Sequence, residues 1–171
     1  MTGETPQMQT EPAAPTPPAD LHIRRDSPLA AEVLPLLERH LALMHASSPP
    51  ESVHALDPAA LAGPEVAFFT LREAGAVLGM AALKRIDASH AEIKSMHIVA
   101  EARGRGLARP LLAHLLAEAR AAGYARLSLE TGVEDVFAPA RALYAAAGFT
   151  PCPPFEGYAE DPNSVFMTLT L

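Results

Sequence analysis

A glycine-rich turn, Arg103-Gly104-Arg105-Gly106-Leu107-Ala108, constrains this chain more than any other feature, because a strand-like run leads into it and a helix-like run follows. Residues 93–99, before the turn, are rich in apolar and β-branched residues, as in a buried strand. After it, apolar residues recur at helical spacing, at positions 107, 111, 112, 115, 116 and 119. A strand, a tight turn and a helix start aim unpaired backbone N–H groups and the positive end of the helix dipole at one point. The turn therefore predicts a site for a phosphate-bearing ligand, with two arginines as further donors.

Phosphate-binding turns differ in where their glycines stand. The dinucleotide fingerprint needs glycines at its first, third and sixth positions, and counting from Gly104 the sixth position is Arg109. A P-loop needs Gly-Lys followed by Ser or Thr, which the chain lacks. The pattern that fits is Arg-x-x-Gly-x-Ala, formed by Arg103, Gly106 and Ala108. Taken alone, these residues also fit a structural turn that needs glycine only for its backbone geometry.

The composition predicts one folded domain preceded by a disordered tail. Residues 1–19 hold five prolines, no Lys or Arg and almost no large apolar residue, so burial cannot offset the entropy of ordering them. Residues 20–171 carry the hydrophobic content that a core needs. The tail lacks the basic and apolar regions of a secretory signal, and no stretch approaches the ~20 apolar residues of a membrane span. The single cysteine, Cys152, fits a reducing compartment. We therefore expect a cytoplasmic protein that does not bind membranes.

The charge balance limits the kinds of partner. The net charge of −7 comes from 13 basic and 20 acidic side chains, which argues against a nucleic-acid partner. It is compatible with a cationic or neutral ligand, although a charge that only keeps the chain in solution explains it as well. The seven histidines are scattered without the spacing of zinc ligands, so no metal site is expected.

Hydrophobic periodicity and turn residues predict alternating strands and helices after residue 20. Ser27 and Pro28 predict the N-cap and first position of a helix whose apolar face includes Val33 and Met44. A strand-rich first half followed by strand–helix–strand–helix predicts one mixed α/β sheet. The expected strands cover residues 21–24, 66–71, 77–84, 91–99, 126–131 and 165–171, the expected helices cover 28–44, 58–61, 106–122 and 137–147, and a short strand at 149–152 is expected to pair with the last strand.

A second motif stands at residues 140–149, where a helix that carries Leu143-Tyr144 precedes Gly148-Phe149. Together with the Arg-x-x-Gly-x-Ala turn, one predicted strand earlier, it resembles the GNAT acetyltransferase superfamily over residues 21–171. The resemblance implies an α/β, single-domain GNAT fold, in which helices flank a mixed, mostly antiparallel sheet with a V-shaped splay at the cofactor strand. Residues 48–56, 92–96, 128–132 and 160–167 further resemble a bacterial GNAT subgroup whose substrate has no firm assignment.

The resemblance implies that an amine attacks the thioester of acetyl-CoA directly, within a ternary complex. Backbone N–H groups of the turn would bind the pyrophosphate, the pantetheine arm would pair with the preceding strand, and one N–H of that strand would polarise the thioester carbonyl. The residues expected to bind acetyl-CoA are Met96, His97, Ile98, Arg103, Gly104, Arg105, Gly106, Leu107, Ala108 and Tyr144.

Three residues are expected to move protons. Tyr144 is the candidate general acid, because a phenol with a pKa of about 10 stays protonated at neutral pH and can donate to the departing thiolate. Glu92 and Glu130 are the candidate bases, since burial would raise the pKa of either carboxyl. Glu92 is slightly favoured, as it stands two residues before Lys94 on the cofactor strand. His54 and His97 are weaker candidates, and His97 is expected to face the other side of the sheet from Met96.

The acceptor is expected to bind in two polar, turn-rich loops, residues 47–56 and 158–164. Each residue there also fits an ordinary turn or cap. The sequence predicts an N-acetyltransferase that acts on a small-molecule primary amine. A peptide or protein acceptor and a non-catalytic acyl-CoA sensor are the alternatives, and a homodimer is compatible with the superfamily although the sequence carries no dimerisation signal. The candidate acceptor-binding residues are Glu51, His54, Tyr158, Asp161 and Asn163.

Overall fold

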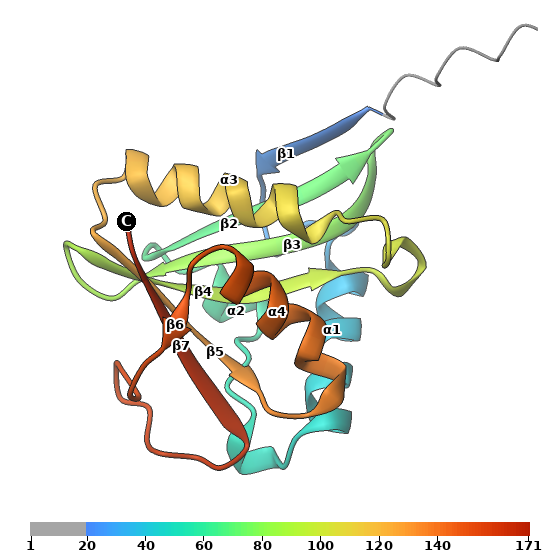
Figure 1. Ribbon diagram of the computed structural model, residues 1–171. Coiled ribbons are helices and arrows are strands. Elements are labelled where there is room, and N and C mark those ends of the chain that lie inside the picture. The colour runs from blue at the N-terminus through green and yellow to red at the C-terminus, as the bar shows by residue number, and fades with distance from the viewer. Residues whose placement is uncertain (1–19) are drawn as a thin grey trace, which may run out of the picture.

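The computed structural model describes residues 20–171, which form one seven-stranded mixed sheet with helices on both faces (Figure 1). The predicted tail, residues 1–19, lies outside the described residues. The strands are β1 (Leu21–Arg25), β2 (Val66–Glu73), β3 (Ala76–Arg85), β4 (His90–Ile98), β5 (Arg126–Gly132), β6 (Thr150–Pro151) and β7 (Ser164–Thr170). The α-helices are α1 (Leu34–Ser47), α2 (Pro58–Leu61), α3 (Ala108–Ala121) and α4 (Ala138–Ala146), and single 3₁₀ turns lie at η1 (Pro50–Ser52), η2 (Ala100–Ala102) and η3 (Asp135–Phe137).

The sheet has the order β1-β2-β3-β4-β5-β7-β6 and is antiparallel except between β4 and β5. Helix α3 makes the crossover between these two parallel strands, as a parallel pair requires. Figure 1 shows α3 and α4 in front of the sheet and α1 behind it. The predicted order of strands and helices is confirmed, and the short strand β6 does pair with β7. Every helix within residues 20–171 is too short or too polar to cross a bilayer.

The two parallel strands separate halfway along their length. They pair only from His90 opposite Arg126 to Ile93 opposite Leu129. Beyond this point β4 continues to Ile98 beside β3, while β5 continues beside β7. The divergence confirms the predicted V-shaped splay at β4.

The prediction that the first helix begins at Pro28 is wrong. Helix α1 begins at Leu34, and residues 28–33 form turns and a bend. The Ser27 hydroxyl accepts a hydrogen bond from the Leu29 N–H at 3.1 Å, which is a local turn contact and not a helix cap. Pro35 falls at the start of the observed helix, where its missing N–H costs little.

Packing of α3 on the sheet supplies much of the core. Its leucines at positions 111, 112 and 115 and Ala119 are buried and pack over β3 and β4, as the predicted apolar face requires. Leu127 and Leu129 of β5 are buried as well. This packing fixes the start of α3 next to the end of β4, where the glycine turn lies.

Candidate active site

The turn between η2 and α3 exposes several unpaired backbone donors. Gly104 and Gly106 have φ angles of +81° and +74°, and no heavy atom lies within 4 Å of a Cβ built on either. Within residues 20–171, no group accepts a hydrogen bond from the N–H of any residue from 104 to 107. Helix α3 begins at Ala108 with no side-chain cap and no acidic residue in its first turn. The turn thus has the open backbone and positive end of a helix dipole that an anionic group requires.

A cleft of about 720 Å³, here called the large cleft, extends from this turn along the end of β4 to α4. Nine of the ten residues expected to bind acetyl-CoA line it: Met96, His97, Ile98, Arg103, Gly104, Gly106, Leu107, Ala108 and Tyr144. Arg105 does not, because its guanidinium forms an ion pair with Glu73 of β2 at 2.6 Å. Arg109 also lines the large cleft, although the sequence reasoning gave it no role.

A second cavity of about 110 Å³, here called the small cavity, is lined by β4 from Ile93 to Met96, earlier along the strand than the large cleft. It lies where β4 and β5 separate, with residues from α1, the 48–55 segment and α4 closing it. Three of the candidate proton-transfer and acceptor residues line it: Glu130, His54 and Tyr144. The large cleft and the small cavity share Met44, Met96, Phe137, Ala140 and Tyr144. The two spaces therefore meet beside Tyr144.

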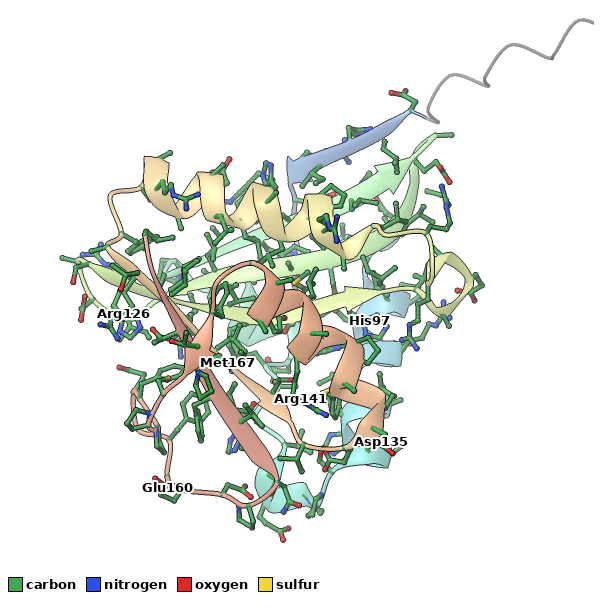
Figure 2. All side chains as sticks on the ribbon, in the orientation of Figure 1. His97, Arg126, Asp135, Arg141, Glu160 and Met167 are labelled. Atoms are coloured by element: carbon green, nitrogen blue, oxygen red, sulfur yellow. The ribbon has the colours of Figure 1, made fainter. Side chains whose placement is uncertain are left out.

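Tyr144 lies on α4 with only 6% of its surface exposed. Its hydroxyl donates to the sulfur of Met96 at 3.5 Å, and burial raises the pKa of the phenol above its usual value. The hydroxyl is therefore protonated at neutral pH. Arg141, labelled in Figure 2, fastens α4 over the splay, since its guanidinium donates to the backbone oxygens of Gly132 at 2.7 Å and Glu134 at 3.0 Å.

The two candidate bases differ in their surroundings. The Glu92 carboxylate is buried, accepts a hydrogen bond from the Tyr158 hydroxyl at 2.5 Å and lies 3.3 Å from Lys94 Nζ. Neither space has Glu92 in its wall. Glu130 is half-buried in the small cavity, forms no ion pair with any of residues 20–171, and burial raises the pKa of its carboxyl. Of the two, Glu130 has the carboxylate that can reach a ligand.

Lys94 closes a polar cluster that the sequence did not predict. Its ammonium donates to the backbone oxygen of His54 at 3.0 Å and to the Tyr158 hydroxyl at 2.8 Å, in addition to the Glu92 ion pair. The rings of His54 and Tyr158 stack edge to face at 5.0 Å. Burial, and next the nearby Glu92 carboxylate, raise the pKa of the Tyr158 phenol. The cluster ties β4 to both acceptor loops through two hydrogen bonds and one ion pair of the lysine.

The other candidate acceptor residues lie around the small cavity without lining it. Asn163 donates from its side-chain amide to Ser52 Oγ at 3.4 Å, and its backbone N–H donates to the Asp161 carboxylate at 2.8 Å. Ser52 itself lines the small cavity. Glu51, in η1, is exposed. The 158–164 loop thus packs behind the 48–55 segment, and His54 is the one candidate acceptor residue in the wall of the cavity.

His97 has a partner that the sequence analysis missed. Its Nδ1 lies 3.1 Å from Nδ1 of His40 on α1, and both rings are buried. Burial lowers the pKa of His40 to about 4 and that of His97 to about 3, so both are neutral at pH 7. His40 follows Leu36 by four residues on the buried side of α1, and this spacing was the available signal for its burial. Among the described residues, no group of three or more His, Cys, Asp or Glu could hold a metal ion.

Comparison with known proteins identifies the architecture. The sequence pattern of the acetyltransferase (GNAT) family matches residues 34–149, which span β2 to β5, the glycine turn and α4. The chain belongs to the GNAT acetyltransferase family. It is therefore an N-acetyltransferase with a single α/β GNAT domain.

Curated relatives cover most of the chain. The uncharacterized N-acetyltransferase YsnE of Bacillus subtilis (strain 168) is 47% identical over 151 residues, which is 88% of this chain and 100% of that protein. An IAA acetyltransferase of Azospirillum brasilense is 40% identical over 146 residues, which is 85% of this chain and 94% of that protein.

Solved structures agree with the fold. A Klebsiella pneumoniae crystal structure, named for acyl-CoA N-acyltransferase activity, is 29% identical with a TM-score of 0.72 and covers 89% of this chain and 98% of its own. A GNAT family acetyltransferase from Elizabethkingia anophelis, solved with acetyl-CoA bound, has the same fold at 16% identity, with a TM-score of 0.59 and coverage of 89% and 99%.

Proposed function

We propose that this N-acetyltransferase moves the acetyl group of acetyl-CoA directly to the primary amine of a small molecule, within a ternary complex. The observation that carries the proposal is the meeting of the large cleft and the small cavity beside Met96 and Tyr144. Two substrates bound in adjoining spaces react without an acyl-enzyme intermediate, because the nucleophile and the thioester lie in contact. The only cysteine, Cys152, lines neither space, and burial raises the pKa of its thiol, so it is unsuited to carry the acetyl group.

The large cleft suits acetyl-CoA as the donor. The free N–H groups of residues 104–107 and the start of α3 would hold its pyrophosphate, and Arg103 and Arg109 add positive charge at the rim. When bound, acetyl-CoA supplies the acetyl thioester. Beyond its separation from β5, β4 has an unpaired edge along which an extended chain can form backbone hydrogen bonds. The acetyl-CoA complex of the Elizabethkingia protein, which shares the fold, supports this choice of donor.

Glu130 is proposed as the group that takes a proton from the acceptor amine. Its carboxylate lines the small cavity, and the nearby positive charge of Lys94 is already matched by Glu92. A raised pKa brings a carboxyl closer to the value that a base needs near neutral pH. The single uncompensated carboxylate also favours a cationic acceptor, which is how an amine arrives at pH 7. A volume of about 110 Å³ favours a small amine.

Tyr144 is proposed as the acid that protonates the departing thiolate. Its hydroxyl is protonated, and the residue lines both spaces where they meet. Among residues 20–171, the hydroxyl has only the weak acceptor Met96 sulfur as a partner. A weakly held proton is available for donation when the thiolate forms.

Calorimetry and an amine screen test the proposal. Titration with acetyl-CoA should show binding in the micromolar range, and a panel of small primary amines, amino acids and short peptides should show thiol release with at least one small amine. Tight acetyl-CoA binding without release on the whole panel would instead indicate a sensor, and release with peptides alone would indicate a protein acceptor. If the folded protein binds neither acetyl-CoA nor CoA, the proposed donor site is wrong.

A further inference from the structure

Ser95 has a backbone conformation that no turn explains. Its φ angle is +54°, in the left-handed region that is unfavourable for residues other than glycine. Two other described non-glycine residues have positive φ, Ala74 and Glu156, and each precedes a glycine in a turn. Ser95 instead lies inside β4. Strained backbone within a regular strand persists where the surrounding structure holds it, and it is concentrated at functional sites.

A bulge in β4 turns Ser95 toward the small cavity. From Lys94 to His97 β4 advances three residues, while its partner β3 advances only two, from Ala82 to Met80. The extra residue comes just after Ile93, which is the last residue of β4 paired with β5. Ser95 therefore lies at the start of the splay, and it lines the small cavity.

The Ser95 hydroxyl has no partner among the described residues. Its Oγ is buried, and none of residues 20–171 forms a hydrogen bond with it. Buried polar atoms without partners are uncommon, because desolvation costs free energy that no new hydrogen bond offsets. Three other described residues have such an atom, His114, Glu134 and Ser164, and none of them lines the small cavity. A strained residue of the cavity wall thus carries a hydroxyl that no group among residues 20–171 satisfies.

Glu130 lines the same cavity, and so does Lys94, whose ammonium pairs with Glu92 and donates to Tyr158 and the His54 backbone. We propose that Ser95 Oγ accepts a hydrogen bond from the nitrogen of the acceptor amine and positions it, while Glu130 pairs with its charge. A primary ammonium has three N–H donors and can satisfy both groups at once. This inference rests on the proposed function, because it requires an amine in the small cavity.

Two variants separate the hydroxyl from the backbone. Ser95→Ala and Ser95→Gly both remove the hydroxyl, but only glycine adopts a positive φ without strain. In thermal unfolding without ligands, Ser95→Ala should melt at the same temperature as the wild type or higher, because it removes an unsatisfied group. Ser95→Gly should do the same. Lower melting temperatures for both variants would mean that the hydroxyl has a partner within the fold, and the inference would be wrong.

Steady-state kinetics with the best amine of the screen provide the second test. Both variants should raise the KM for that amine by about tenfold or more, the loss expected for one hydrogen bond to a charged group, while kcat changes far less. The calorimetric Kd for acetyl-CoA should stay at the wild-type value. An unchanged KM in both variants, or a raised KM in Ser95→Ala alone, would overturn the role of the hydroxyl. Failure of the proposed function would look different, since the wild type itself would then acetylate no amine.

Discussion

Replacing Gly106 with alanine should weaken acetyl-CoA binding while the protein stays folded, and Gly75 provides a matched control. Both glycines have left-handed backbones, with φ of +74° and +85°, and a Cβ on either would meet no heavy atom within 4 Å. The cost to folding is therefore the left-handed strain alone, about 1–2 kcal/mol at each position. For a chain of this size, that lowers the melting temperature by roughly 2–4 °C per kcal/mol.

The two substitutions should differ in their effect on the ligand. Gly106 lines the large cleft among the free N–H groups, so an added methyl group occupies space that the pyrophosphate needs. Gly75 lies in the turn between β2 and β3 and lines neither space. We expect Gly106→Ala to raise the Kd for acetyl-CoA at least about tenfold, which corresponds to about 1.4 kcal/mol. Gly75→Ala should leave the Kd unchanged.

Isothermal titration with acetyl-CoA and scanning calorimetry on the same samples measure both quantities. The comparison is decisive because the two variants share the folding cost. If Gly106→Ala binds acetyl-CoA as tightly as the wild type, the turn does not hold the pyrophosphate closely. If both variants lose affinity to the same extent, the loss reflects reduced stability and not a blocked site.

Four further substitutions follow from the described contacts. Tyr144→Phe should lower kcat by about 100-fold with little change in the Kd for acetyl-CoA, since it removes a proton donor and keeps the packing of the ring. Glu130→Gln should lower kcat/KM for the amine by about 100-fold or more with little loss of stability. Glu92→Gln should instead lower the free energy of unfolding by about 3 kcal/mol, because it leaves the buried Lys94 without its counter-charge. Burial raises the pKa of Asp26, but hydrogen bonds from Arg72 and Thr70 outweigh it and lower the pKa to about 2 from 3.8. The ionised carboxylate therefore stabilises the fold above pH 4 by about 2 kcal/mol, and this contribution is lost as the pH falls from 4 to 2. The loss should be absent in Asp26→Asn.

For each of these substitutions, a different result would contradict the prediction. A Tyr144→Phe protein with full kcat would remove the tyrosine from proton transfer. Loss of activity in a stable Glu92→Gln protein, with Glu130→Gln unaffected, would reverse the roles of the two carboxyls. Parallel denaturation curves for the wild type and Asp26→Asn between pH 4 and pH 2 would show that Asp26 does not carry the acid sensitivity.

The donor side of the site could be predicted from the sequence because it is nearly continuous in the chain. Residues 96–109 form the end of β4, the glycine turn and the start of α3, and all of these have local signals: strand composition, glycines and a leucine stripe. The same local signals predicted the order of strands and helices. The wrong helix start at Ser27 also came from a local signal, because serine before proline is a common helix start. The chain instead forms a turn at Ser27, and the helix starts a few residues later, beside Pro35.

Long-range pairing decided what the sequence could not predict. Nothing near Arg105 in the chain indicates that Glu73, on a different strand, will bind its guanidinium. Glu92 was favoured over Glu130 because of its neighbour Lys94, but Tyr158, far along the chain, binds the Glu92 carboxylate. The facing of each side chain depends on the register of the sheet, and a bulge such as that at Ser95 reverses the facing of the residues after it.

The small cavity, where we propose that the acceptor binds, has a wall built from many separate parts of the chain. Its wall combines α1, the 48–55 segment, both diverging strands and α4, so each part can change without altering the glycine turn. The two proton-transfer candidates in that wall are fixed to rigid elements, Glu130 to β5 and Tyr144 to α4, whereas Ser52 and His54 lie on a connecting segment. We therefore expect substitutions in the 48–55 segment to change which amine is accepted while the Kd for acetyl-CoA stays constant, because this segment contributes nothing to the wall of the large cleft.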